Sequence, residues 1–188
     1  PRVFHWNCYI ARMARIPLTV KSPLHPATHG VKGLRQRPQT IRKPGMTTDN
    51  IRHRGRFTAF DPITTRWADN GLYGHVNNVT YYAWFDTSVN RYLIEQGGLD
   101  IHQGQEIAYV VSSSCDYFSP VAYPERIEAG LRVEKLGNSS VTYNIGIFRE
   151  GEEQACAVGR FVHVFVNRDT DRPVPIPAGV REALERLV

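Results

Sequence analysis

The chain contains little cysteine. Its 188 residues include three, Cys8, Cys115 and Cys156, which are widely spaced and odd in number. No disulfide framework and no pattern of zinc ligands follows from them, so we expect no metal site. A reducing environment is the default for such a chain, and the cytoplasm is the expected location. No cofactor is predicted.

Two further features are missing. No apolar run approaches the roughly 20 residues that a helix needs to cross a bilayer, so no membrane span is predicted. The sequence also lacks a Gly-x-Ser-x-Gly motif. A hydrolase that places a serine triad on a strand-to-helix elbow is therefore not expected.

Acidic residues are absent from the first 48 positions. This segment holds nine of the 23 Lys and Arg residues and no Asp or Glu, whereas residues 49–188 hold 14 basic and 18 acidic residues. The formal charge of +5 therefore originates in the N-terminal segment. The remainder, which we predict to be a single domain, is mildly acidic.

Residues 1–48 are unlike a folded domain, because they are basic, rich in proline and without a sustained period. We interpret them as a disordered extension, or as a segment upstream of the natural start with Met46 as initiator. A targeting peptide would place the protein in an organelle, but residues 1–45 contain a single serine, Ser22. A nucleic-acid-binding arm normally accompanies a basic domain face, so no nucleic acid partner is expected.

The most distinctive stretch is residues 69–78 (DNGLYGHVNN), which precede a predicted helix at residues 79–96. The loop combines a carboxylate, an imidazole, three amides and two glycines. Glycine permits sharp turns and lets a ligand approach the backbone closely. The start of the helix presents free N–H groups and the positive end of its dipole. This combination suits a carbonyl oxygen that develops negative charge.

Alternation of apolar and polar residues predicts five strands. The first runs from about residue 56 to 67, where Pro62 marks an edge position or a break. The others span residues 107–118, 126–136, 140–149 and 155–167. Short turns at Gly137-Asn138 and Glu150-Gly151 join the last three into an antiparallel meander. A short amphipathic helix is predicted at residues 177–187.

The predicted helix at residues 79–96 is apolar nearly all round in its first half, which indicates a buried helix. The simplest arrangement is an α+β domain over residues 49–188, in which a twisted antiparallel sheet wraps around one long central helix. Such a sheet leaves edge strands exposed. Pairing of two copies would protect them, so at least a homodimer is expected.

With these elements in place, the chain resembles the hotdog-fold thioesterases of the 4-hydroxybenzoyl-CoA thioesterase type over about residues 56–170. The matching segments are residues 66–78 (RWADNGLYGHVNN), Tyr81 or Tyr82, residues 119–121 (SPV) and residues 137–140 (GNSS). The resemblance implies a hotdog fold and hydrolysis of an acyl-CoA thioester at a pocket between subunits. It also implies a homodimer or homotetramer that needs no metal or cofactor.

One position departs from the pattern of that family. The family usually reads Trp-x-Asp-x-Asp-x-x-Gly-His-Val-Asn-Asn, whereas this chain has Asp69 at the first acidic position and Gly71 at the second. In the family the second carboxylate is usually assigned as nucleophile or general base. Two functions therefore stay open. One is an acyl-CoA hydrolase that uses a loop carboxylate, and the other is a catalytically weak module that binds acyl-CoA or acyl-carrier protein.

The predicted catalytic residues lie in this loop. Asp69 is the candidate general base, because a carboxylate is ionised at neutral pH. His75 can hydrogen-bond the substrate carbonyl or water, and Asn77 can orient water. The predicted substrate-binding residues are Gly71, Tyr73, Gly74 and Val76.

Each candidate also has a structural alternative. Asp69 can organise the loop by accepting N–H groups, His75 can bind the backbone, and Asn77 or Asn78 can cap the helix. Asp86 on the helix can reach a pocket but is expected to make a structural contact. For Tyr73 the alternative to substrate binding is a core or dimer contact, which is also the expected role of Tyr81, Tyr82 and Trp84. Arg160 and Arg168 can bind the phosphates of coenzyme A, but each is expected to be a surface charge.

Overall fold

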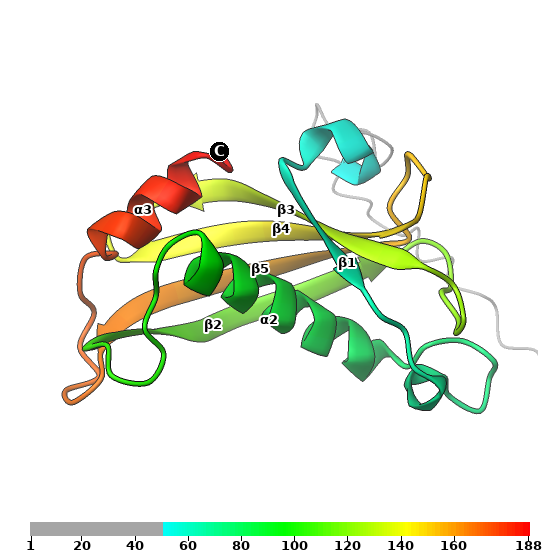
Figure 1. Ribbon diagram of the computed structural model, residues 1–188, viewed down its shortest axis with the longest axis horizontal. Helices are drawn as coiled ribbons and strands as arrows, with labels where there is room; N and C mark the ends of the chain where they lie inside the picture. The colour runs from blue at the N-terminus through cyan, green and yellow to red at the C-terminus, as the bar shows by residue number, and fades with distance from the viewer. Residues whose placement is uncertain (1–50) are drawn as a thin grey trace, which may run out of the picture. The chain divides into compact units, whose positions relative to one another are not determined.

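The computed structural model describes residues 51–188, and the interpretations of residues 1–48, Met46 included, lie outside the described residues. Within residues 51–188 a long helix crosses one face of a five-stranded antiparallel sheet (Figure 1). The strands are β1 (Ala59–Ile63), β2 (Glu106–Tyr117), β3 (Ile127–Leu136), β4 (Ser140–Arg149) and β5 (Ala157–Asn167). The helices are α2 (Asn78–Glu95) and α3 (Ala178–Glu185), and short 3-10 turns are η1 (Arg54–Arg56) and η2 (Trp67–Asp69).

The spatial order of the strands, β1-β3-β4-β5-β2, confirms the predicted α+β hotdog fold. Strands β3, β4 and β5 pair in chain order as the predicted meander. Strand β1 adds to β3 on one side, and β2 adds to β5 on the other. Pro62 lies opposite Glu128 in the edge strand β1, which is where a residue without an N–H donor is tolerated.

Burial of apolar side chains between α2 and the sheet stabilises the domain. Phe85, Val89 and Leu93 of α2 have no exposed surface. Phe85 lies directly over Gly159 of β5, where a Cβ atom would be 2.5 Å from its ring. A glycine at this position therefore lets the helix approach the sheet. The buried sheet residues in the same core include Tyr143, Ile145, Ile147, Phe161 and Phe165.

The sheet covers only one side of α2. Trp84 and Phe85 are buried, whereas Val79 is 65% exposed and Asp86 is exposed as well. The expectation that the first half of the helix is buried nearly all round is therefore wrong for the single chain. The physical reason is that a five-stranded sheet packs against one face of a helix and leaves the opposite face without neighbours.

Strand β2 forms a long exposed edge of the sheet. It spans 12 residues, and Tyr109, Val110 and Val111 are 45%, 44% and 59% exposed. The register shifts by one residue between Val110 and Ser112, which marks a β-bulge. An exposed sheet edge of this length offers unpaired backbone groups to another strand.

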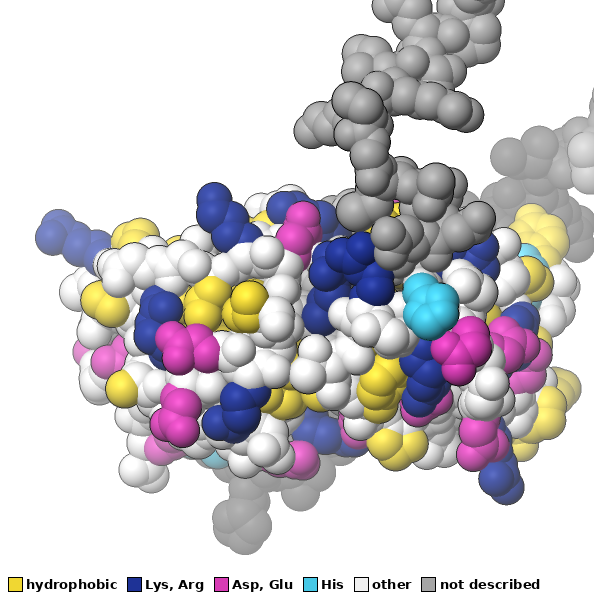
Figure 2. All heavy atoms as spheres, turned by 90° about the horizontal axis from the view of Figure 1, so that it is seen from above, with side chains coloured by type: hydrophobic (Ala, Val, Ile, Leu, Met, Phe, Trp, Pro, Cys, Tyr) yellow, Lys and Arg dark blue, Asp and Glu magenta, His cyan; other side chains and the backbone are white. Residues whose placement is uncertain are grey.

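None of the helices in residues 51–188 is long and apolar enough to cross a membrane. Seen from above, basic and acidic side chains are interleaved over the described residues, and no large area of one sign is present on this face (Figure 2). The mixture agrees with the small charge excess that the sequence gives for residues 49–188.

Candidate active site

Asp69, in the turn η2, holds the loop before α2 closed. Asp69 is 2% exposed, and its Oδ1 accepts hydrogen bonds from Arg66 Nε (3.1 Å) and Nη2 (2.7 Å). Its Oδ2 accepts the Arg66 backbone N–H at 2.7 Å. The Asp69 carbonyl oxygen accepts the Asn77 N–H at 3.0 Å. Asp69 therefore ties both ends of the loop together, and both of its carboxylate oxygens are occupied.

The tip of the loop is a tight turn stabilised by its own backbone. The Gly71 N–H donates to the His75 carbonyl oxygen at 2.8 Å, and the Gly74 N–H donates to the Gly71 carbonyl oxygen at 3.2 Å. Gly74 has φ +79°, a conformation that favours glycine. The Tyr73 ring stacks on the His75 ring with centroids 6.3 Å apart. The glycines thus allow the turn that brings the His75 imidazole beside the start of α2.

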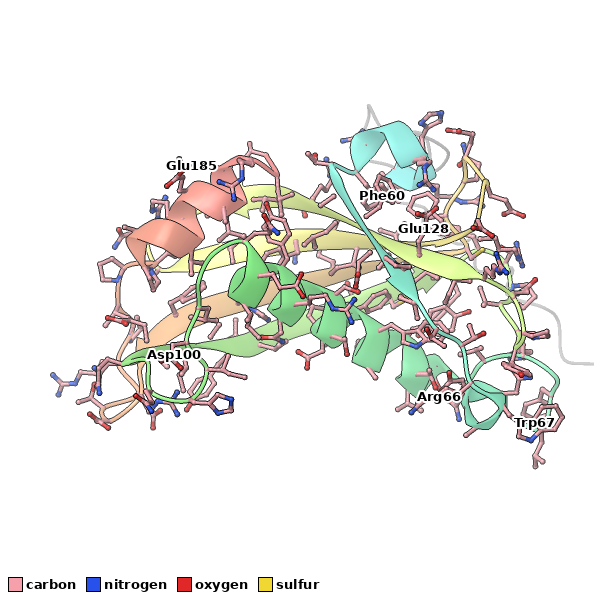
Figure 3. The ribbon with its side chains drawn as sticks, viewed as in Figure 1. Phe60, Arg66, Trp67, Asp100, Glu128 and Glu185 are labelled. Atoms are coloured by element: carbon pink, nitrogen blue, oxygen red, sulfur yellow. The ribbon has the colours of Figure 1, made fainter. Side chains whose placement is uncertain are left out.

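Large apolar side chains surround this turn without being covered. Trp67, Leu72 and Tyr73 are 79%, 105% and 89% exposed. Figure 3 shows Trp67 at the outer end of the loop, pointing away from the sheet. Its ring meets the Tyr123 ring edge-on at 6.1 Å. The loop therefore presents an aromatic rim to solvent.

Backbone donors at the start of α2 are almost all engaged within the protein. Asn77 is the N-cap, and its Oδ1 accepts the Val79 N–H at 3.3 Å, while its carbonyl oxygen accepts the Thr80 N–H. The Val76 N–H donates to the Val121 carbonyl oxygen at 2.7 Å. Among the contacts of residues 51–188, the Asn78 N–H has no acceptor. One donor, at the positive end of the helix dipole, is thus free to bind a ligand oxygen.

Two adjoining hollows meet at His75 and Asn78. The first, a cleft of about 340 Å³, is mainly apolar, and Tyr81 lies at its base with its ring edge-on to the Tyr117 ring at 5.2 Å. Its lining residues are His75, Val76, Asn78, Tyr81, Tyr117, Phe118, Ser119 and Pro120. The second, a hollow of about 900 Å³, opens over the loop and is lined by Trp67, Asn70, Gly71, Leu72, Tyr73, Gly74, His75, Asn77 and Asn78.

No carboxylate lines either hollow in the described part of the chain. Burial raises the pKa of Tyr81 to about 12, so its hydroxyl stays protonated at neutral pH. The His75 Nδ1 lies 3.2 Å from the Val76 carbonyl oxygen. Such a contact favours the tautomer with the proton on Nδ1, which leaves a lone pair on Nε2. His75 is therefore the side chain best placed to accept a proton from water.

The structure gathers most of the predicted site residues around the hollows, namely Gly71, Tyr73, Gly74, His75, Val76 and Asn77. It places Asp69 beneath the loop instead, and its predicted role as general base stays untested. Asp86 accepts from Asn90 at 3.1 Å and lines a separate depression on the helix surface. Arg160 pairs with Glu134, and Arg168 donates to the carbonyl oxygens of Gly104 and Ile101.

Some lining residues were not singled out from the sequence. Tyr117 and Phe118 come from the end of β2, and no local pattern links them to a loop about 40 residues earlier. Whether the Asn78 N–H is free depends on whether Asn77 or Asn78 caps the helix. Only the backbone geometry shows that Asn77 is the cap. In residues 51–188, no group of three or more His, Cys, Asp or Glu side chains is arranged to hold a metal ion.

A five-stranded antiparallel sheet packed against one long helix, in this strand order, is the hotdog fold. The chain belongs to the thioesterase-like superfamily, whose model matches residues 63–184. This membership confirms the predicted class of enzyme, a thioesterase and hence a hydrolase.

Solved structures agree with this assignment. The PA5185 protein from Pseudomonas aeruginosa PAO1 is 64% identical, with a TM-score of 0.71 over 72% of this chain and 95% of that one. A predicted thioesterase from Bacillus stearothermophilus is 29% identical, with a TM-score of 0.59 over 69% and 95% of the two chains. A Thermus thermophilus thioesterase complexed with coenzyme A and Zn is 24% identical, with a TM-score of 0.58 over 70% and 94%. The last likeness shows the fold alone.

Proposed function

We propose that this chain hydrolyses acyl-CoA thioesters at the cleft where α2 begins. The observation that carries the proposal is that Asn78, whose N–H has no acceptor among the described contacts, lines an apolar cleft together with His75. Coenzyme A in the Thermus thermophilus neighbour supports coenzyme A as the carrier here.

With His75 as the base, hydrolysis passes through a tetrahedral intermediate. Water attacks the thioester carbonyl carbon while His75 Nε2 takes one of its protons. The Asn78 N–H holds the oxygen that becomes negative in the tetrahedral intermediate. The intermediate then re-forms the carbonyl and breaks its C–S bond, and the departing thiolate takes the proton back from the His75 imidazolium. Asp69 and Asn77 keep the loop and the helix start in place.

The predicted use of a loop carboxylate is the competing mechanism. It requires Asp69 to exchange its bonds to Arg66 for a bond to water, since both oxygens are occupied. The weak binding module is favoured by a different observation, the absence of any carboxylate lining the hollows of the described residues.

Replacement of His75 by alanine separates these possibilities. We expect His75→Ala to lower kcat by about 10²-fold, because general-base catalysis contributes about 10²–10⁴-fold. Thiol release from acetyl-, octanoyl-, palmitoyl- and benzoyl-CoA measures the effect. His102→Ala, at an exposed histidine outside both hollows, is the matched control.

The carboxylate mechanism gives a different result. It predicts that Asp69→Asn abolishes turnover in protein that is still folded at the assay temperature, while His75→Ala retains most of it. A wild-type protein that binds the acyl-CoAs but releases no thiol identifies the binding module instead.

We also propose that the protein acts as a homodimer that pairs along β2, with the tetramer as the larger alternative. The exposed edge of β2 and the uncovered side of α2 support this arrangement. Light scattering is expected to give at least twice the mass of one chain. Val111→Lys, on the exposed edge, is expected to dissociate the pair, whereas Val188→Lys at the exposed C-terminus is not. A monomeric wild-type protein would contradict the proposal.

A further inference from the structure

Residues 119–125, here called the cleft wall, begin with Ser119 and Pro120, which line the cleft, and they are bonded directly to the loop before α2. The Val121 carbonyl oxygen accepts the Val76 N–H at 2.7 Å. The Tyr123 N–H donates to Asn70 Oδ1 at 2.9 Å. Burial raises the pKa of Tyr81 at the base of the cleft, and the Val121 backbone partly opposes this rise. A displacement of the cleft wall would therefore move the helix start and the residues beside it.

Arg149, the last residue of β4, fastens the cleft wall at both ends. Its Nη2 donates to the Pro120 carbonyl oxygen, and its Nε donates to Glu125 Oε1 at 2.9 Å. The third nitrogen, Nη1, donates to Glu152 Oε2 at 3.3 Å. The planar fork of a guanidinium can hold three acceptors in fixed directions, which a lysine cannot do.

Glu125 passes this restraint on to the backbone of the cleft wall. Its Oε2 accepts the Ala122 N–H at 2.8 Å, so one carboxylate joins Arg149 to the middle of the wall. The Glu125 carbonyl oxygen accepts the hydroxyl of Thr65 at 2.9 Å, and Thr65 is 8% exposed. The wall is thus anchored to the strand end of β4 and to the segment after β1.

The Arg149–Glu125 pair is partly sheltered and close to the site without belonging to it. The two side chains are 25% and 38% exposed, and neither lines the hollows. The positive charge of Arg149 lowers the pKa of Tyr81, against the larger effect of burial. This places the guanidinium within electrostatic range of the base of the cleft.

We propose that Arg149 is a positioning residue for thioester hydrolysis. By fixing the cleft wall, it keeps the Val76 N–H on the Val121 carbonyl oxygen and thereby directs the free Asn78 N–H into the cleft. The inference rests on the proposed function, because it concerns the donor that stabilises the oxyanion. A misplacement of about 1 Å at a reacting centre can cost about 10²-fold in rate.

The test compares kcat and KM of four proteins with the acyl-CoA that the wild type hydrolyses fastest: wild type, Arg149→Ala, Arg149→Lys and Arg126→Ala. Arg149→Ala is expected to lower kcat by about 10–100-fold and to change KM by less than about threefold, because the apolar lining that binds the acyl group is retained. Arg149→Lys is expected to recover part of the rate, since one ammonium can still reach one of the three acceptors.

Arg126→Ala is the matched control. Arg126 lies next to Glu125 in the sequence, but its side chain is 84% exposed and pairs with Glu150 at 3.7 Å. It is expected to retain the wild-type kcat. Circular dichroism and melting temperatures show whether each variant is folded at the assay temperature. Glu125→Gln is a second, milder change to the contact between Arg149 and the cleft wall.

Three results would overturn the inference. They are an unchanged kcat in Arg149→Ala and Glu125→Gln, an equal loss in Arg126→Ala, or a loss fully explained by the unfolded fraction without recovery in Arg149→Lys. Failure of the proposed function looks different, because the wild type itself then releases no thiol from any acyl-CoA.

Discussion

Gly71→Asp is expected to raise the rate of thioester hydrolysis by about 10²-fold or more if the wild type is the weak binding module, because a well-placed general base usually contributes that much, and by far less if His75 already acts as the base. Position 71 lines the larger hollow beside His75, where no carboxylate of the described residues is present. An aspartate there is ionised at neutral pH and lies near the positive end of α2. It would supply the carboxylate that the related thioesterase pattern carries at this position.

The backbone can accept this change. A Cβ atom at Gly71 would meet nothing closer than the His75 carbonyl oxygen at 3.6 Å, an ordinary contact. Gly71 is also not among the described glycines with positive φ. Gly71→Asn, which has the same shape without the charge, and Gly71→Ala are the controls. Two results would contradict the hypothesis that the wild type lacks a base. Either Gly71→Asn gives the same gain in rate as Gly71→Asp, or Gly71→Asp gives no gain although it still binds acyl-CoA.

The second large effect concerns acid stability. His163 on β5 is 1% exposed, and neither ring nitrogen has a hydrogen-bond partner among the described residues. The Tyr143 ring of β4 packs edge-on against it at 5.2 Å. Burial lowers the pKa of His163 from 6.5 to about 4, and the nearby charge of Asp86 on α2 only partly opposes this shift.

The sign of the pH dependence follows from these values. As the pH falls below about 6.5, the unfolded chain binds a proton at His163 that the folded protein does not bind until about pH 4. The free energy of unfolding therefore decreases across this window, by about 2 kcal/mol at pH 5 from this group alone. Urea unfolding at pH 7, 6 and 5 measures the decrease.

His163→Leu isolates the contribution of this histidine. The variant is expected to lose less stability than the wild type between pH 7 and 5, with a difference of about 2 kcal/mol at pH 5. At pH 7 it should be at least as stable, because leucine leaves no unpaired nitrogen in the core. The same pH dependence in both proteins would show that His163 does not bind the proton.

The strands and helices follow closely from local periodicity, because one face of each is buried. The predicted strand at residues 140–149 coincides with β4, and the other elements after the loop differ from their predicted ends by one or two residues. The first strand was predicted to reach about residue 67, but β1 ends at Ile63. The mutual bonds between Arg66 and Asp69 form a turn there, which alternation of apolar residues does not reveal.

The site was predictable where it is continuous in sequence and not where it is assembled in space. Residues 69–78 carry their own chemistry, so their position at the start of a helix could be inferred. The contact between Arg149 and the cleft wall could not be inferred, because Arg149 and Pro120 are 29 positions apart. In the sequence, Arg149 is only a charged residue at the end of a strand. The burial of His163 was equally hidden, since a polar residue in an apolar strand suggests a solvent-facing position.

The single free donor at the start of α2 limits the kind of bond that the cleft can break. Between Val76 and Thr80, only the Asn78 N–H lacks an acceptor among the described contacts. One donor contributes about 10²–10³-fold to stabilisation of an oxyanion. A thioester needs no more, because sulfur shares its lone pair poorly with the carbonyl and a thiolate departs readily. Oxygen esters and amides have stronger conjugation and poorer leaving groups, so their hydrolysis would need more hydrogen-bond donors. The site is therefore expected to select its substrates by the leaving group as well as by the acyl chain.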